Sequence, residues 1–234
     1  MCLGASIVKG ETSPGTVGFR KVLRDDLVGF GVDVNMVGSV QLGNMTDNDL
    51  EAYGGNRITQ IHDHAKAIVP KTLPNVFVIQ VGTNNILQNL DIDKAGEQMK
   101  DFIDYLVETA PRSFVILSTI LTNTVGGGSL EPSVLDINQQ YRDLMPTFEA
   151  EGTPVVLAEL HPSNGGDDVP QVADIGPDGS HPLVSGYEKM GHILAQAVKD
   201  ADAKDYIQVA TDNGIPDDGD AEKAGSSRKR RHWH

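Results

Sequence analysis

The stretch that decides the fold of this chain is Val76-Phe77-Val78-Ile79-Gln80-Val81-Gly82-Thr83-Asn84-Asn85. A nearly continuous apolar run leads directly into a polar turn that contains glycine. Such a run is typical of a central strand in a parallel sheet, because that strand is buried on both faces. Residues 114–117 and 154–158 read in the same way, and residues 32–37 alternate apolar and polar side chains as a half-buried strand does. The sequence therefore predicts a parallel sheet.

The amino-terminal residues supply a further strand. Met1-Cys2-Leu3 is apolar and runs into Gly4-Ala5-Ser6-Ile7, which reads as the end of a buried strand whose beginning is missing. We therefore expect a processed or truncated start, and a central sheet of about five strands in total.

Helical patterns lie between these strands. Apolar residues recur at spacings of three and four along residues 95–110 and 183–198, which places them on one face of a helix. Weaker patterns of the same kind cover residues 18–29, 58–69 and 134–149. Strands that alternate with helices predict an α/β fold, a three-layer α/β/α sandwich around a central parallel sheet.

Length and composition fit one globular domain. The chain has 234 residues, of which 39% are hydrophobic, and this is enough for a substantial core. We assign residues 1–200 to this domain. Residues 201–234 are acidic and then basic, with Arg228-Lys229-Arg230-Arg231 near the end, so they predict a mobile tail.

The charge of the chain limits its partners. A formal net charge of −14 and a pI near 4.7 argue against nucleic acid or an anionic membrane as the main partner. No apolar run approaches the roughly 20 residues of a membrane span, and the amino terminus lacks the basic-then-apolar layout of a signal peptide. Cys2 is the single cysteine, which excludes an intramolecular disulfide and a cysteine-rich zinc site.

Two histidine pairs raise the question of a metal. His62-Asp63-His64 falls in an expected helix, where side chains two residues apart point in different directions, and His232-Trp233-His234 falls in the expected tail. Both pairs are interpreted as surface histidines. A glycine-rich phosphate loop of the Walker type does not occur, so neither a metal nor a cofactor is expected.

Three polar motifs fall where parallel strands deliver functional residues, in the loops that follow their carboxyl ends. These motifs are Gly4-Ala5-Ser6, Gly82-Thr83-Asn84-Asn85 and Asp178-Gly179-Ser180-His181. In the last motif, Asp178 is close enough in sequence to accept the Nδ1 proton of His181, which leaves Nε2 free to take a proton from a serine hydroxyl. An alternative reading makes the same motif a helix start, with Asp178 or Ser180 as the cap and Pro182 at the first helical position.

The order of these motifs resembles the SGNH or GDSL hydrolase superfamily, whose four blocks contribute Ser, Gly, Asn and His in turn. The second block is similar to Glu51-Ala52-Tyr53-Gly54-Gly55-Asn56. Further stretches resemble the secreted microbial and fungal esterases of the third carbohydrate-esterase family; these are Gly18-Phe19-Arg20-Lys21, Val37-Gly38-Ser39, Asp47-Asn48-Asp49 and Gly186-Tyr187-Glu188-Lys189-Met190.

The resemblance implies a flavodoxin-like SGNH hydrolase fold and assigns a role to each matching residue. Ser6 is the implied nucleophile, His181 its general base and Asp178 the orienting carboxylate. The implied oxyanion donors are the backbone N–H groups of Ser6 and Gly55 and the side-chain amide of Asn84. The implied function is a serine esterase that hydrolyses short acyl esters, acetyl in particular, on a small ester or an acylated carbohydrate. Secretion is implied by the relatives, and a monomer is expected.

One position departs from the family pattern. The first block usually reads Gly-Asp-Ser, whereas alanine stands at position 5 of this chain. If the missing carboxylate normally accepts hydrogen bonds in the nucleophile loop, its loss leaves buried donors unpaired and displaces or slows Ser6. Two alternatives to an active short-acyl esterase stay open. One is a catalytically impaired relative that binds a small acylated or sugar ligand, and the other is an acyl hydrolase of the lysophospholipase or thioesterase type.

Overall fold

A six-stranded sheet forms the centre of the protein, which we describe from a computed structural model for residues 1–215. The strand order is β2-β3-β1-β4-β5-β6; β2 is antiparallel to β3, and the other neighbours are parallel. The predicted α/β fold with a central parallel sheet is confirmed, with two differences: the sheet has six strands rather than about five, and its edge strand β2 is antiparallel. The strands are β1 (Cys2–Gly4), β2 (Val40–Gln41), β3 (Asp49–Ala52), β4 (Val76–Gln80), β5 (Phe114–Ser118) and β6 (Val155–Ala158).

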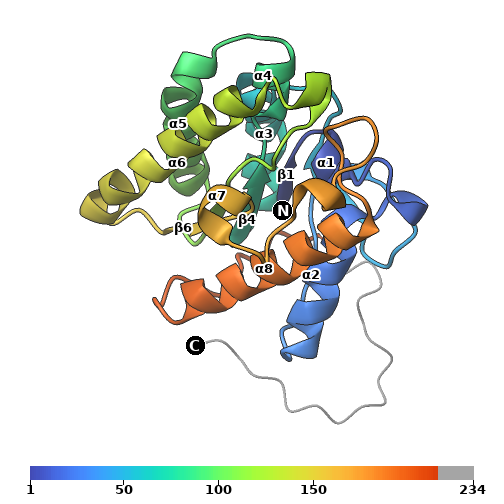
Figure 1. The fold of residues 1–234 in the computed structure, drawn as a ribbon. Coiled ribbons are helices and arrows are strands. Elements are labelled where there is room, and N and C mark those ends of the chain that lie inside the picture. The colour runs from blue at the N-terminus through green and yellow to red at the C-terminus, as the bar shows by residue number, and fades with distance from the viewer. Residues whose placement is uncertain (216–234) are drawn as a thin grey trace.

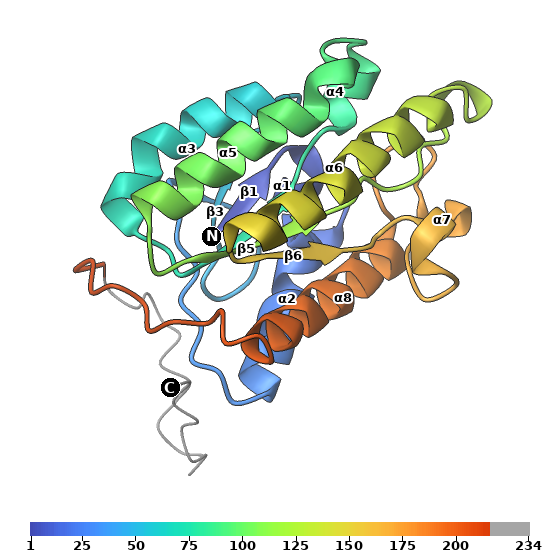
Figure 2. The same cartoon turned by 90° about the vertical axis from the view of Figure 1, so that its left-hand side faces the viewer.

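Helices cover both faces of this sheet, as Figures 1 and 2 show. One layer holds α3 (Ile58–Thr72), α5 (Ala95–Thr109) and α6 (Glu131–Glu151), and the other holds α2 (Gly18–Gly29) and α8 (Val184–Asp202). Shorter helices and 3₁₀ turns lie in the loops: α1 (Ser6–Lys9), α4 (Thr83–Leu87), α7 (Pro162–Gly165), η1 (Pro14–Thr16), η2 (Ile92–Lys94), η3 (Val125–Gly127) and η4 (Val172–Asp174).

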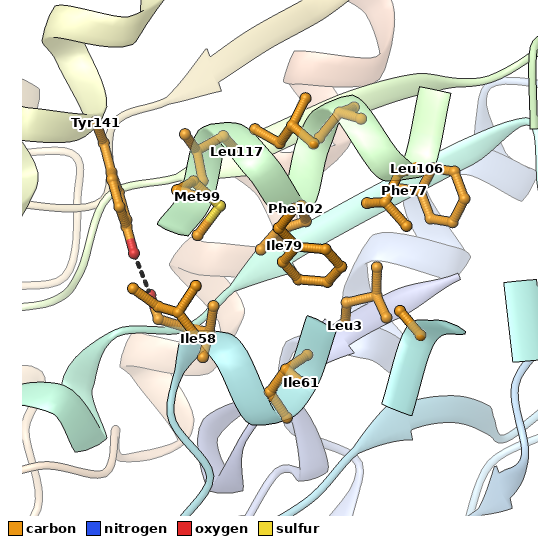
Figure 3. Close-up of a cluster of buried hydrophobic side chains, with 14 of the residues drawn as sticks. Leu3, Ile58, Ile61, Phe77, Ile79, Met99, Phe102, Leu106, Leu117 and Tyr141 are labelled. Atoms are coloured by element: carbon orange, nitrogen blue, oxygen red, sulfur yellow. Dashed lines mark hydrogen bonds between the residues drawn. The ribbon is translucent and has the colours of Figure 1, made fainter. Parts of the chain in front are cut away.

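Alternate side chains of the central strands fill two separate cores. Phe77 and Ile79 of β4 face α3 and α5, whereas Val78 between them faces the layer of α2 and α8. Figure 3 shows the first of these cores, in which Tyr141 of α6 is fully buried and donates a hydrogen bond of 3.0 Å to the carbonyl oxygen of Val81. That bond fixes the end of β4, from which the Gly82-Thr83-Asn84 turn begins.

The prediction of a strand at residues 32–37 is wrong. This segment forms no strand, and the backbone N–H of Met36 donates instead to the Asp47 carboxylate at 2.7 Å. The place beside β1 belongs to β3, which contains Glu51. Glu51 is buried, and its carboxylate accepts hydrogen bonds from Ser39 N at 2.9 Å and from the Tyr53 hydroxyl at 2.9 Å. Because this strand contains a buried acidic side chain that is satisfied by hydrogen bonds, its apolar pattern is interrupted and the sequence did not predict it.

The five expected helices are present with small changes in their ends. The helix expected at residues 18–29 has those bounds, and the one expected at 95–110 ends at Thr109. The other three helices extend beyond their expected limits by a few residues, and α8 continues to Asp202 because Ala201 is buried against the core.

The segment after α8 returns to the domain. Tyr206 and Ile207 pack against the core between the sheet and the layer of α2 and α8, and the Asn75 side-chain amide donates to the carbonyl oxygen of Gln208 at 2.8 Å. The division at residue 200 and the mobility of the tail stay predictions. The basic cluster at Arg228 to Arg231 and the histidines of the tail lie outside the described residues. Within residues 1–215, none of the helices combines the length and apolar character that a membrane span requires.

A buried arginine joins the first loops to this scaffold. The Arg20 side chain is fully buried and donates to the carbonyl oxygens of Val8 (2.9 Å), Lys9 (3.2 Å), Thr16 (2.9 Å) and Leu42 (2.9 Å). Two of these carbonyls belong to α1, which begins at Ser6. Arg20 therefore determines where that short helix lies.

We expect Arg20→Met to lower the free energy of unfolding by at least about 3 kcal/mol, because each buried carbonyl that loses its donor costs about 1 to 3 kcal/mol. Urea unfolding at neutral pH measures the change. The matched control is Arg112→Met, which makes the same substitution at an exposed position. Equal unfolding free energies for the two variants would contradict this account of Arg20.

Candidate active site

Ser6 lies directly after the central strand β1, at the start of α1. The turn is tight: a Cβ atom on Gly4 would lie 2.2 Å from the Gln80 carbonyl oxygen and 2.4 Å from Val8 Cγ2. The helix ends after one turn at Gly10, whose φ of +80° is a conformation that glycine adopts without strain. The position of the Ser6 side chain is thus set by close backbone packing on both sides.

His181 and Asp178 meet Ser6 from the opposite end of the chain. The Ser6 Oγ atom lies 2.7 Å from His181 Nε2, and His181 Nδ1 lies 2.8 Å from Asp178 Oδ2. The other carboxylate oxygen of Asp178 accepts the backbone N–H groups of Ser180 and His181, both at 2.9 Å. With the proton on Nδ1, His181 donates to Asp178 and presents Nε2 as an acceptor to the Ser6 hydroxyl.

The electrostatics of Asp178 favour its ionised form. Burial acts to raise its pKa, but the backbone N–H groups of His181 and Ser180 and the His181 side chain outweigh burial, so that the pKa of Asp178 lies below its usual value. Asp178 is therefore a carboxylate at neutral pH and can orient the imidazole.

The alternative reading of this turn as a helix cap is wrong. Helix α8 begins at Val184 with Leu183 as its N-cap, so Asp178, Ser180 and Pro182 all precede the helix. The turn is closed instead by the Gly176 N–H, which donates to the His181 carbonyl oxygen at 2.7 Å. The side chains of Asp178 and Ser180 contact groups other than the amino end of α8.

The expected oxyanion donors share a pocket with the serine. This pocket has a volume of about 560 Å³, and among its lining residues are Ser6, Gly55, Asn84 and His181. Asn84 is largely buried in α4, and one of its amide hydrogens is used in a 3.0 Å bond to the Asn56 carbonyl oxygen. An amide nitrogen carries two hydrogens, so one is left for a ligand. The structure thus gathers every predicted site residue except Asp178 at one pocket, with Asp178 behind His181.

Two charged residues of this pocket were not predicted from the sequence. Lys9 and Glu11 line it, and Lys9 Nζ lies 2.9 Å from Glu11 Oε1. The second oxygen, Glu11 Oε2, lies 3.8 Å from His181 Nε2. Their spacing could have predicted this position, because they follow Ser6 by only three and five residues and a short turn keeps them close to it.

A buried polar network behind the histidine turn was also not predicted. Asn123 is buried; its side-chain amide donates to the Ser180 hydroxyl at 2.9 Å, and its backbone N–H donates to Glu131 Oε2 at 2.9 Å. Glu131 Oε1 in turn lies 2.8 Å from Nε2 of the buried His161. The network holds Ser180, whose N–H binds Asp178, against the body of the domain.

The alanine at position 5 leaves the nucleophile in place. Ala5 is buried and its carbonyl oxygen accepts the Lys9 N–H at 3.0 Å, while Ser6 keeps its contact with His181. The expectation that alanine at position 5 displaces Ser6 is therefore wrong. Buried polar atoms without a hydrogen-bond partner among the described residues do occur near this loop, at Gln80 Nε2 in the neighbouring strand and at Thr83 Oγ1.

The histidines of α3 have partners other than a metal. The His62 ring stacks on Phe102 at 4.9 Å between centroids, and the His64 ring stacks on Tyr53 at 3.6 Å. In the part of the chain that the structure describes, no group of three or more His, Cys, Asp and Glu side chains is placed to hold a metal ion.

Comparison with known proteins agrees with this arrangement of fold and motifs. A multidomain esterase of Ruminococcus flavefaciens is 28% identical over 134 residues, which are 56% of this chain and 16% of that protein. The chain thus spans a small part of the length of that relative.

Solved structures show the same fold. A family 3 carbohydrate esterase of Clostridium thermocellum matches with a TM-score of 0.73 at 21% identity, covering 87% of this chain and 96% of the other. A carbohydrate esterase of family 3 from Talaromyces cellulolyticus matches with a TM-score of 0.69 at 19% identity, covering 86% and 95%.

The family model of the GDSL-like lipase/acylhydrolase family matches residues 2–189, a span that includes the four blocks with Ser6, Gly55, Asn84 and His181. The resemblance inferred from the order of those motifs is therefore confirmed, and the protein belongs to the GDSL-like lipase/acylhydrolase family.

Proposed function

We propose that this protein is a serine esterase that hydrolyses acetyl and other short acyl esters of hydroxyl-rich alcohols such as carbohydrates. The observation that carries the proposal is the line of contacts from Ser6 Oγ to His181 Nε2 (2.7 Å) and from His181 Nδ1 to Asp178 (2.8 Å) at one pocket. Membership in a family of lipases and acylhydrolases supports ester hydrolysis in general.

In the proposed first step, His181 Nε2 takes the proton of the Ser6 hydroxyl while Ser6 Oγ attacks the ester carbonyl carbon. The carbonyl electron pair moves to oxygen and forms an oxyanion. The donors for this oxyanion are the N–H groups of Ser6 and Gly55 and the remaining amide hydrogen of Asn84. When the intermediate collapses, the bond to the leaving oxygen breaks and that oxygen takes the proton from Nε2. The acyl group stays on Ser6.

In the second step water replaces the alcohol. His181 Nε2 takes a proton from the water, whose oxygen attacks the acyl carbon, and the same oxyanion donors act again. Collapse breaks the bond to Ser6 Oγ, which recovers its proton from Nε2, and the carboxylic acid departs. The ionised Asp178 stabilises the imidazolium in both steps and keeps the ring in one orientation.

The lining of the pocket supports a short acyl group. Of the described residues around it, Ile7 and Leu87 are the large apolar ones, and Lys9, Glu11, Thr83 and Ser180 are polar. A long acyl chain gains about 0.8 kcal/mol for each methylene group that it buries in an apolar groove, a factor of about four in rate. This pocket offers little surface for that gain.

We therefore expect kcat/KM to be higher for 4-nitrophenyl acetate than for 4-nitrophenyl octanoate, because the longer chain loses conformational freedom in the pocket without enough apolar surface to offset that loss. Both esters are assayed below the concentration at which the octanoate aggregates. Because the leaving group is the same, the ratio reports on the acyl side alone. Equal or faster hydrolysis of the octanoate would remove the short-acyl proposal and would favour the lysophospholipase or thioesterase alternative.

A further inference from the structure

The Lys9–Glu11 ion pair lines the pocket but belongs neither to the triad nor to the oxyanion donors. We propose that it is a binding subsite for the leaving alcohol, which recognises a hydroxyl group on the carbon adjacent to the one that bears the ester oxygen. The preferred substrates are then partly acylated polyols, with at least one free hydroxyl beside the acyl group. This inference rests on the proposed esterase function.

The first support is position. Lys9 is one helical turn after Ser6 and lies on the same side of α1, and Glu11 follows at the helix end. Both side chains line the pocket together with Ser6 and His181. Because the leaving oxygen takes its proton from His181 Nε2, it lies within hydrogen-bond reach of that atom in the transition state. Glu11 Oε2, at 3.8 Å from Nε2, is therefore beside the leaving alcohol.

The second support is the fixed backbone under Glu11. The Glu11 N–H donates to the Ser6 carbonyl oxygen at 3.1 Å, and the Glu11 carbonyl oxygen accepts a hydrogen bond of 2.7 Å from the buried Tyr187 hydroxyl. Space for the carboxylate is kept by Gly54, where a Cβ atom would lie 2.9 Å from Glu11 Oε1. A carboxylate held at a constant position relative to the nucleophile is suited to discriminate between substrates.

The third support is chemistry. A hydroxyl group both donates and accepts a hydrogen bond, and the pair offers one acceptor and one donor side by side, 2.9 Å apart. The side chains are 29% and 38% exposed, so a ligand can reach them, and an ion pair this exposed adds little to the stability of the fold. A leaving group with a methyl group in place of the hydroxyl would displace water from both charges and return no hydrogen bond.

The test compares two isosteric acetates, 2-hydroxyethyl acetate and propyl acetate, with wild-type protein, Lys9→Met and Glu11→Met. For the wild type we expect kcat/KM to favour 2-hydroxyethyl acetate by at least about tenfold. In each variant this ratio is expected to fall at least fivefold (about 1 kcal/mol), toward one. The matched control is the double variant Asp63→Leu with Lys66→Met, which removes an exposed pair of the same 2.9 Å separation on α3 and is expected to keep the wild-type ratio.

The outcomes separate this inference from the proposed function. If the wild type hydrolyses both acetates but the ratio is the same in Glu11→Met, Lys9→Met and wild type, the subsite is overturned while the esterase stands. That result also covers the case in which Glu11 acts only on the charge of His181, because both substrates would then slow together. If the wild type hydrolyses neither acetate nor an aryl acetate, the proposed function itself fails. Glu11→Asp, which keeps the acceptor, is expected to retain more of the ratio than Glu11→Met.

Discussion

Ser6→Ala is expected to lower kcat for 4-nitrophenyl acetate by about 10⁴-fold or more, because the hydroxyl that forms the acyl-enzyme is gone. The reason for so large an effect is the single contact of 2.7 Å between Ser6 Oγ and His181 Nε2, through which both the attack and the return of the proton pass. Release of nitrophenolate by the purified chain, at protein concentrations high enough to detect a residual rate, measures the loss.

His181→Ala is expected to cost about as much, and the double variant is expected to cost little more than either single variant, because the two side chains act as one unit. The matched control is Ser163→Ala. Ser163 also lies 2.9 Å from a histidine nitrogen, in this case Nδ1 of His161, but outside the pocket, so its removal is expected to leave the rate close to that of the wild type.

Activity that survives both Ser6→Ala and His181→Ala would place the chemistry elsewhere in the protein. A wild-type chain that binds an acetylated sugar but releases no acetate would favour the catalytically impaired alternative, for which Ala5 is the sequence reason. The contact of Ser6 with His181 despite Ala5 is the structural argument for turnover.

The extent to which the sequence predicts this molecule depends on what each residue must satisfy. Strand β4 and helix α5 are read correctly because their apolar side chains follow a regular spacing that only burial explains. Strand β3 is missed because Glu51 is buried through hydrogen bonds to Ser39 and Tyr53, which are contacts that a hydrophobic pattern does not contain. Residues 32–37 have the alternation of a strand, but β3 occupies the edge of β1 that they would need.

The site residues likewise divide into those that the sequence predicts and those that depend on tertiary contacts. Ser6, Asn84 and His181 are predictable because each falls in a loop at the carboxyl end of the sheet, where the topology brings distant segments together. Glu11 falls in the same loop as Ser6, but the contact of its side chain with the pocket also depends on the end of α1 at Gly10 and on the space left by Gly54, which the order of strands and loops does not contain. The support of Ser180 by Asn123 is likewise a tertiary contact between residues 57 positions apart.

Asn84→Ala is expected to lower kcat by about 10² to 10³-fold, or about 2.7 to 4 kcal/mol, with a smaller effect on KM. The amide hydrogen that Asn84 does not use for Asn56 acts on charge that exists only in the tetrahedral intermediate, so its loss affects the transition state more than substrate binding. The inhibition constant of a boronic acid that forms a tetrahedral adduct with Ser6 is expected to rise in parallel with the loss of kcat.

Asn84 also holds the loop of Gly55 and Asn56, and a control must separate that role from catalysis. Gln88 provides it, because its side-chain amide donates to the Gly55 carbonyl oxygen at 2.8 Å, much as Asn84 donates to Asn56 at 3.0 Å, but Gln88 does not line the pocket. Gln88→Leu removes an anchor of the same loop and no oxyanion donor, so a loss of less than about tenfold is expected. If the two variants lose the same activity, or if Asn84→Ala changes KM alone, Asn84 anchors the loop and the oxyanion has other donors.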